Sequence, residues 1–392
     1  MLIAGFAPLS RRIFHVLPTL LANVVFGRIL NRPSPRGPLF VTWLLTFDCN
    51  AFCGFCGTHS LKKIFPEKMP IERALEIADE IADAGTWAVG FTGGEVFLSP
   101  LLFPLVERLK SRGVVVYIVT NGIGLAKYAQ RLVELEVDVI QVSLDFADAE
   151  LHDRNRKVGG LYEGALAGLR EIKRLRKKRK PIIKTNTVVM KENIDDIDII
   201  LSKLESLVDY VYAQPISYGM KNSPHNRGRE RVYKYVFEKD EEASIRETYN
   251  AQLLHRAGFS GRYYREVPDY WFNPQYLAET TPCWAPFLRL MIQPTGEVLH
   301  CGANDDFGVV GDLKTSSLMS AWNSPAMRQQ RAIIGAKKNN CICWSRDTSF
   351  NAAIKSVPLV NDLPYMGSDE TAYDEPQPTS EKQRSSDVKT DG

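Results

Sequence analysis

The sequence predicts an α/β fold: a partial (β/α)6 barrel followed by a small C-terminal α+β unit. Three observations predict it. Apolar runs rich in valine, isoleucine and aromatic residues alternate six times with amphipathic runs between residues 38 and 218. Polar motifs follow directly after several of the apolar runs, and four dispersed cysteines lie beyond residue 280. Such alternation is typical of a parallel sheet, whose functional residues gather at the carboxyl ends of the strands.

The repeating units can be placed along the chain from their periodicity. Strands buried on both faces have nearly continuous apolar character, and surface helices have an apolar stripe. The expected strands are 39–46, 88–92, 114–120, 137–144, 182–190 and 210–215. The expected helices are 71–84, 101–112, 125–135, 162–179 and 194–207.

The segments outside the barrel have weaker signals. Residues 1–37 contain an amphipathic segment that is too short and too polar to cross a bilayer, so we expect it to pack on the barrel, with contact to a membrane surface as the alternative. Residues 219–280 read as a linker region with one helix at 233–256. Residues 281–361 predict a hairpin around Gly296 and two short helices, and 362–392 have the composition of a disordered tail.

Charge and cysteine content limit the classes of function. The net charge of +3 is small, and the basic run 173–180 reads as a solvated helix end, so nucleic acid is not expected as a partner. Seven cysteines, in groups of three and four, argue against a full disulfide framework. They suit metal-cluster ligation in a reducing compartment, and we expect a cytoplasmic protein, with membrane association as the alternative.

The group of three follows the first strand as Cys49-x3-Cys53-x2-Cys56. Three thiolates on one loop can hold three irons of a four-iron cluster and leave the fourth open to a chelating ligand. The alternative is a structural zinc ion with His59 as its fourth ligand. Zinc motifs more often pair two C-x2-C units, so the spacing favours the cluster.

Polar motifs also end the next strands. Thr92-Gly93-Gly94-Glu95 ends the second strand, and Thr120-Asn121 ends the third. Ser143 and Asp145 end the fourth, and Arg156 follows in a His-Asp-x2-Arg segment. The alternatives are an ordinary glycine turn, a helix cap at Asp145 or Asp153, and a surface arginine.

Jointly, these motifs resemble the SPASM/Twitch branch of the radical S-adenosylmethionine (SAM) superfamily, similar to molybdenum-cofactor, pyrroloquinoline-quinone and sulfatase-maturation enzymes. The resemblance implies that SAM binds the open iron and is cleaved reductively to a 5′-deoxyadenosyl radical. It implies contacts of Glu95 with the SAM amino group, Ser143 with the ribose and Arg156 with the carboxylate. The remaining candidates for the SAM site are Phe55, Gly93, Gly94, Thr120, Asn121 and Asn186.

The group of four comprises Cys283, Cys301, Cys341 and Cys343. With the hairpin and the Trp322 helix it resembles the SPASM/Twitch extension, which implies a second, auxiliary [4Fe–4S] cluster. The C-x-C spacing of the last pair departs from the usual C-x2-C, so the ligand set stays open, and a zinc knuckle is the alternative. His300, beside Cys301, is a candidate neighbour of the auxiliary cluster or a surface residue.

These observations predict an enzyme that abstracts hydrogen from an unknown substrate, with a flavodoxin or ferredoxin as electron donor. Peptide or protein modification ranks first. Oxidation or C–C bond formation on a small molecule or membrane lipid comes next, and a non-enzymatic zinc scaffold is the alternative of another class. The candidates for substrate contact are Gln141, Lys184 and Gln214, and those for acid–base roles are Asp145, Lys184, Tyr218 and His225.

Overall fold

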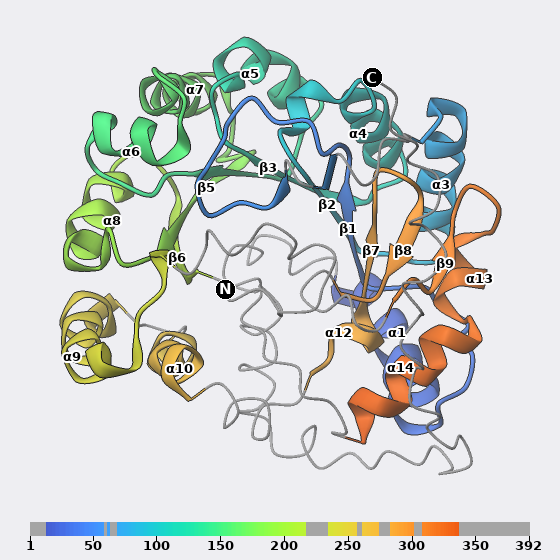
Figure 1. The fold of residues 1–392 in the computed structure, drawn as a ribbon. Helices are drawn as coiled ribbons and strands as arrows, with labels where there is room; N and C mark the ends of the chain where they lie inside the picture. The colour runs from blue at the N-terminus through green and yellow to red at the C-terminus, as the bar shows by residue number, and fades with distance from the viewer. Residues whose placement is uncertain are drawn as a thin grey trace, which may run out of the picture.

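The computed structural model of the protein describes residues 13–58, 61–62, 69–216, 234–256, 261–273, 283–301 and 308–336. A nine-stranded sheet in the order β6-β5-β4-β3-β2-β1-β7-β8-β9 curves around an interior (Figure 1). The first six strands are all parallel. They are β1 (Phe40–Leu44), β2 (Ala88–Thr92), β3 (Val115–Thr120), β4 (Val139–Ser143), β5 (Ile182–Val189) and β6 (Tyr210–Pro215).

Helices cover the outer face of this sheet. Strand residues that point outward, such as Trp43, Phe91 and Ile118, are fully buried against the helices. This layer follows from the alternation of the strands, which sends every second side chain to the helix side. The covering helices are α3 (Ile71–Asp83), α4 (Leu102–Ser111), α5 (Leu125–Glu134), α7 (Leu161–Leu175) and α8 (Ile197–Glu205).

All six predicted strands and five predicted helices are present, and the partial barrel is confirmed. The predicted end of the helix at residue 179 is wrong, because α7 ends at Leu175. Lys178 and Arg179 take positive φ angles, which a helix cannot continue. Arg176 and Arg179 turn back instead to pair with Asp209, and the Arg179 Nη2–Asp209 Oδ1 distance is 2.9 Å.

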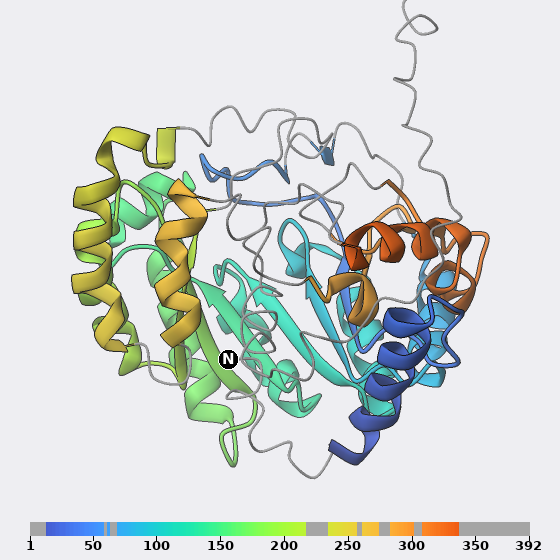
Figure 2. The same ribbon diagram turned by 90° about the horizontal axis from the view of Figure 1, so that it is seen from below.

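Two α-helices described between residues 38 and 280 were not predicted. The first, α6 (Ala149–Arg156), is capped by Asp148, whose side chain accepts from the Leu151 amide. The second, α10 (Gly261–Phe272), falls in the predicted linker region and packs on α9 (Glu242–Leu253). Helices α9 and α10 stand together beyond β6 and lengthen the wall of the barrel there (Figure 2). The helix predicted at 233–256 is α9, which is shorter than expected. Turns of 3-10 helix flank it at Lys239–Glu241 and Leu254–Arg256.

The C-terminal unit continues the barrel sheet. Strand β7 (Arg289–Ile292) pairs in parallel with β1, and β8 (Glu297–Leu299) and β9 (Gly311–Asp312) follow antiparallel. The short helix α12 (Ala285–Leu288) precedes this hairpin, and α13 (Leu318–Trp322) and α14 (Pro325–Gly335) follow it. The predicted hairpin and its two helices are thus present, joined to the first barrel strand.

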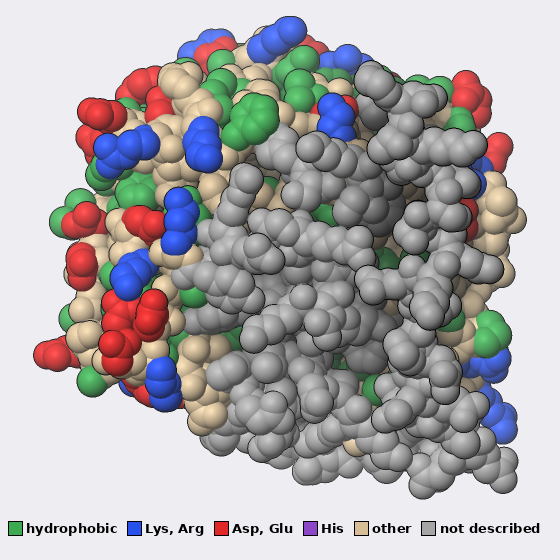
Figure 3. Space-filling view, in the orientation of Figure 1, with side chains coloured by type: hydrophobic (Ala, Val, Ile, Leu, Met, Phe, Trp, Pro, Cys, Tyr) green, Lys and Arg blue, Asp and Glu red, His purple; other side chains and the backbone are tan. Residues whose placement is uncertain are grey.

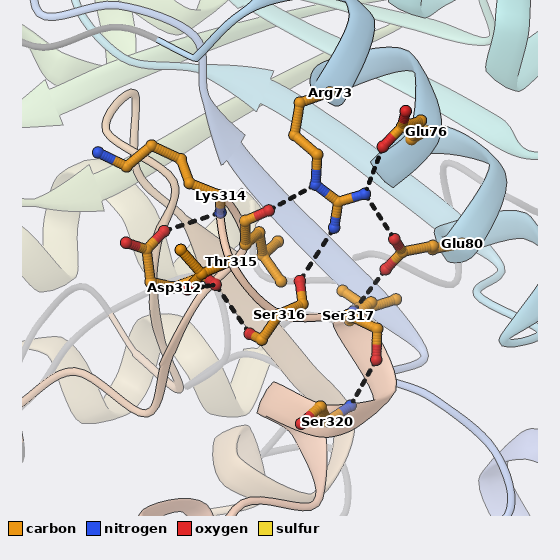
Figure 4. Close-up of polar contacts among 11 residues, drawn as sticks. Arg73, Glu76, Glu80, Asp312, Lys314, Thr315, Ser316, Ser317 and Ser320 are labelled. Atoms are coloured by element: carbon orange, nitrogen blue, oxygen red, sulfur yellow. Dashed lines mark hydrogen bonds and ion pairs between the residues drawn. The ribbon is translucent and has the colours of Figure 1, made fainter.

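Arg73 on α3 fastens this unit to the barrel (Figure 4). Its guanidinium donates to the carbonyl oxygens of Leu313 at 2.6 Å and Ser316 at 2.9 Å. Glu80, about two turns further along α3, pairs with Arg73 at 2.8 Å and accepts from the Leu318 amide at 2.6 Å. Because the groups of the C-terminal unit in these contacts are backbone carbonyls and an amide, the contacts fix the position of its backbone on α3.

The N-terminal segment packs on the barrel, as expected. Helix α1 (Ile13–Ala22) runs into a π-helical turn, η2 (Asn23–Ile29). Asn23 Nδ2 donates to the Gly37 carbonyl at 2.8 Å, and Val16, Leu20 and Val24 pack with the buried Trp284 and Phe287. Within the described residues, no helix combines the length and the apolar character needed to cross a bilayer.

Surface charge is mixed on the face seen in Figure 1. Basic and acidic side chains alternate over α6, α8 and α9 in the space-filling view (Figure 3). In the predicted basic run, Arg176 and Arg179 are paired with Asp209, and Lys173 donates to the Ser206 carbonyl. The Arg176 side chain is largely buried in this pair, but Lys173, Lys177, Lys178 and Arg179 are exposed, so most of the run is solvated.

Candidate functional site

The cysteine loop follows β1 and is held on two sides by backbone hydrogen bonds. On one side, the amides of Phe52 and Gly54 donate to the carbonyls of Arg156 and Asn155 at the end of α6, at 3.0 and 3.4 Å. On the other side, the loop meets the glycine segment after β2, as described next. The loop is therefore fixed between the ends of two different strand–helix units, at the carboxyl edge of the sheet.

Gly93 and Gly94 allow the segment after β2 to touch the cysteine loop. The Gly94 amide donates to the Thr46 carbonyl at 2.7 Å, and the Glu95 amide donates to the Asp48 carbonyl at 2.8 Å. A Cβ atom on Gly93 would lie 2.3 Å from the Thr46 oxygen, and one on Gly94 would lie 2.0 Å from the Asp48 oxygen. Glycine is thus required by a close approach within the chain. Contact of these glycines with SAM stays a prediction.

The three thiols influence one another and one cation. Burial, with smaller contributions from Cys56 and Cys49, raises the pKa of Cys53 to about 12, although Arg156 opposes the shift. Burial also raises the pKa of Cys49. The Nη1 atom of Arg156 lies 4.0 Å from Cys53 Sγ. Thiols gathered around a buried cation suit a group that binds thiolates, so this donor set fits the iron–sulfur cluster predicted from the spacing.

Glu95 is almost fully buried and accepts hydrogen bonds at both carboxylate oxygens. Thr120 Oγ1 donates to Oε1 at 2.7 Å, the Phe97 amide donates to the same oxygen at 3.3 Å, and the Asn121 amide donates to Oε2 at 2.8 Å. A carboxylate offers about four acceptor positions, so Oε2 retains one for a further donor. Burial raises the pKa of Glu95, and the three hydrogen bonds oppose that shift. This geometry is compatible with the predicted contact to an ammonium group.

Arg156 and Asp145 form a buried ion pair behind the thiols. Arg156 Nε and Nη2 lie 2.9 and 2.7 Å from Asp145 Oδ2, and the Val188 amide donates to Asp145 Oδ1 at 3.0 Å. Burial alone would lower the pKa of Arg156. Asp145 and the thiols of Cys53 and Cys56 raise this pKa by more, so its net shift is upward. Asp145 is therefore a partner of Arg156 and not a helix cap, and Arg156 is not a surface residue. Nothing in the sequence spacing indicated this pair.

The carboxyl end of β4 and the middle of β5 bring two further candidates together. Ser143 and Asn186 are direct neighbours in the β4–β5 register. Asn186 is 5% exposed, and its Oδ1 atom is buried without a hydrogen-bond partner. A buried polar atom without a partner is costly in a finished site, so Asn186 indicates that a polar ligand belongs here. The residues present thus fit SAM, which supplies polar ribose and amino acid groups.

Asn121 connects the third strand to the cysteine loop. Its Nδ2 atom donates to Asn50 Oδ1 at 2.7 Å. The sequence motifs did not single out Asn50. Phe55 stacks edge-on with Tyr235 at 6.0 Å and lies 5.7 Å below the guanidinium of Arg156. Every predicted SAM-site residue therefore lies at one end of the barrel. The candidates His59, Tyr218 and His225 lie outside the described residues.

The C-terminal cysteines are described in part. Cys283 is half-buried and Cys301 is buried, while Cys341 and Cys343 lie outside the described residues. His300 is buried and contacts Gln330, so it is not a surface residue. Arg331 is fully buried over the Trp322 ring at 4.2 Å, and its Nη1 and Nη2 atoms have no hydrogen-bond partner. An uncompensated buried cation fits an anionic group such as a thiolate-bound cluster nearby.

Two protein families match the chain. Residues 43–204 match the radical SAM superfamily, and residues 283–345 match the SPASM family, an iron–sulfur cluster-binding domain. The chain belongs to the radical SAM superfamily. It is an enzyme of the SPASM branch, with SAM, a [4Fe–4S] cluster and auxiliary iron–sulfur ligation in the C-terminal unit. The zinc-scaffold alternative has no support from either match.

Curated relatives differ in the share of the chain that they cover. AdoMet-dependent heme synthase of Methanosarcina barkeri is 32% identical over 163 residues, 41% of this chain and 46% of the relative. Mycofactocin maturase MftC of Mycobacterium ulcerans is 26% identical over 307 residues, 75% of this chain and 77% of the relative. The chain thus spans less than half of the heme synthase but most of the maturase.

Solved structures share the fold. Streptococcus suis SuiB bound to precursor peptide SuiA has a TM-score of 0.57 at 16% identity, covering 80% of this chain and 70% of that chain. The enzyme anSMEcpe with bound AdoMet and a Kp18Cys peptide has a TM-score of 0.53 at 15% identity, covering 74% and 82%. These likenesses confirm the partial barrel with its C-terminal unit.

Proposed function

We propose that this protein cleaves SAM reductively at the Cys49–Cys53–Cys56 loop and abstracts a hydrogen atom from a peptide or protein substrate. The observation that carries the proposal is the position of this loop, fixed between the Glu95 segment and the end of α6. When bound, the cluster and SAM supply the 5′-deoxyadenosyl radical. The protein positions them through Arg156 beside Cys53, Glu95 after β2, Ser143 at the end of β4 and its β5 neighbour Asn186.

A peptide substrate is supported by two kinds of likeness. Mycofactocin maturase aligns over three quarters of the chain, and SuiB was solved with its precursor peptide. The second candidate is synthesis of a small-molecule cofactor. It is favoured by the heme synthase and by pre-heme d1 synthase of Dinoroseobacter shibae, 33% identical over 42% of this chain and 38% of the relative. Under either candidate, a flavodoxin or ferredoxin is the proposed electron donor and the cytoplasm the proposed location.

The Cys53→Ala variant tests the proposed reaction. Anaerobically reconstituted wild-type protein, reduced with dithionite, is expected to release 5′-deoxyadenosine from SAM, measured by liquid chromatography. The variant is expected to release none above background, because two thiolates cannot retain the cluster with an open iron. Iron and zinc analysis of the same samples is the control. Zinc in place of iron in the wild type, or equal product from both proteins, would contradict the proposal.

A further inference from the structure

The outer face of α1 and η2, at the rim of the molecule, carries a row of exposed apolar side chains (Figure 2). Leu17, Leu21, Val25 and Leu30 are 47, 53, 40 and 39% exposed. Four residues make about one turn of α1, and the Leu30 amide donates to the Val25 carbonyl across one wider turn of η2. The four side chains therefore lie along one side of the segment, and we call them the apolar row.

The opposite side of the same segment is already packed against the protein. Val16, Leu20 and Val24 contact the core cluster that contains Phe287. Arg28 belongs to this inner side as well, because its guanidinium lies 5.5 Å from the ring centroid of Phe287. A surface helix normally carries polar or charged residues on its outer face. A segment that is apolar on both sides therefore indicates a partner for the outer one.

The charge around the apolar row has one sign. Residues 1–47 contain five arginines and no acidic residue, although the whole chain has 46 acidic residues and a net charge of only +3. Arg32 and Arg36 are exposed, and neither forms an ion pair with an acidic side chain in the part of the chain that the structure describes. The exposed side of this segment thus combines apolar surface with positive charge that the protein does not compensate.

A pocket of about 460 Å³ lies beside α1 and continues this basic surface. It is lined by Thr19 of α1, by Arg36 and by Arg112. Arg112 is neutralised by two carboxylates of α3, so Arg36 is the arginine of this pocket without a carboxylate partner among the described residues. Thr86 and Val114, which also line the pocket, precede β2 and β3. The pocket therefore lies at the amino edge of the sheet, away from the cysteine loop.

We propose that the apolar row and its neighbouring arginines bind a membrane surface that contains anionic phospholipids. Aliphatic side chains on one helix face enter the boundary between headgroups and acyl chains, and arginines beside them attract the phosphate groups. The pocket gives a phosphate group a recess against Arg36. A second copy of the chain is disfavoured as the partner, because a symmetric contact would bring the arginines of both copies together without acidic residues. The inference is independent of the proposed function, since this face lies apart from the cysteine loop.

Co-sedimentation of the full-length, reconstituted protein with sucrose-loaded vesicles tests this proposal. Vesicles of phosphatidylcholine alone are compared with vesicles of phosphatidylcholine and phosphatidylglycerol in equal parts. The wild type is expected to bind the anionic vesicles with about tenfold or higher affinity, because two arginines without protein partners contribute to that binding. Raising the salt concentration is expected to reduce this preference, since salt screens exposed charges.

The apolar contribution is tested by the double variant Leu17→Ser with Leu21→Ser. Both side chains are about half exposed, so the barrel core is left intact, and far-UV circular dichroism checks the fold. The double variant is expected to bind anionic vesicles about tenfold or more weakly, because each buried methylene group contributes to membrane affinity. Ile199→Ser removes another exposed aliphatic side chain, on α8, and should bind as the wild type does.

The electrostatic contribution is tested by the double variant Arg32→Gln with Arg36→Gln, which is expected to lose the preference for anionic vesicles. Arg170→Gln removes an exposed arginine from α7 and should keep that preference. A wild type that binds neither kind of vesicle, or both equally, would overturn the proposal, as would wild-type binding by the serine double variant. Light scattering of the same samples reports the oligomeric state. A dimer that the serine double variant dissociates would assign this face to a second copy and overturn the proposal as well.

Discussion

The Gly94→Ala variant is expected to lose the SAM-binding cluster while its barrel stays folded. A Cβ atom at this position would lie 2.0 Å from the Asp48 oxygen and 2.6 Å from the Asp48 carbonyl carbon. Both are backbone atoms of the residue before Cys49, so the cysteine loop must move. Displaced thiols cannot meet the irons at bonding distance, and we expect the variant to retain about four fewer irons per chain than the wild type.

Iron analysis after anaerobic reconstitution measures this loss, and far-UV circular dichroism checks that the secondary structure is intact. Gly159→Ala is the matched control. A Cβ atom there meets no other atom within 4 Å, and its φ angle is ordinary. The control should bind iron as the wild type does. A Gly94→Ala protein with full iron content and wild-type cleavage of SAM would show that the close approach of the two segments is dispensable.

The second large effect is expected for Asp145→Asn. This change leaves the charge of Arg156 buried without its counterion, because Asp145 is fully buried and Arg156 nearly so. Removing one partner of a buried pair costs about 3–5 kcal/mol of unfolding free energy. Urea denaturation of the reconstituted protein under anaerobic conditions measures the shift. We also expect weaker retention of the cluster, since Arg156 lies beside Cys53.

The double variant Asp145→Leu with Arg156→Met separates stability from function. Replacing both partners of a buried pair by apolar residues is often neutral for stability. The double variant is therefore expected to regain stability relative to Asp145→Asn and still to fail in SAM cleavage. The exposed pair Glu171–Arg174 on α7 is the control, and Glu171→Gln should leave the denaturation midpoint unchanged. An Asp145→Asn midpoint equal to that of Glu171→Gln would rule out a structural role for the pair.

Strand positions were predictable because burial between two layers demands apolar runs, and these runs are visible in the sequence. β2 and β6 have the bounds that the sequence predicts. The convergence of the motif residues was predictable for a different reason. The carboxyl ends of parallel strands meet at one edge, so Glu95, Asn121, Ser143 and Asn186 had to converge.

Other features depend on contacts that the local sequence does not contain. Helix α6 was missed because AELHDRNR has almost no apolar stripe, although its buried residues His152 and Arg156 face the site. Helix α10 was missed because Pro268 and its aromatic residues obscure the helical period. The pairing of Arg156 with Asp145 could not be foreseen, since both residues also suited other roles. Nor did any sequence signal indicate that β7 would join β1, because strand pairing is decided by the whole fold.

The junction of β1 with β7 also sets how far Cys301 lies from the first cysteine loop. Met291 of β7 pairs with Thr42 of β1 and with Leu299 of β8, so Cys301 lies level with the beginning of β1. The first cluster loop follows the other end of the same strand. Between Phe40 and Leu44 the strand rises about 13 Å. One continuous sheet therefore holds Cys301 and the first cysteine loop at opposite ends of β1, so hydrogen-bonded strands and not a flexible linker fix their separation.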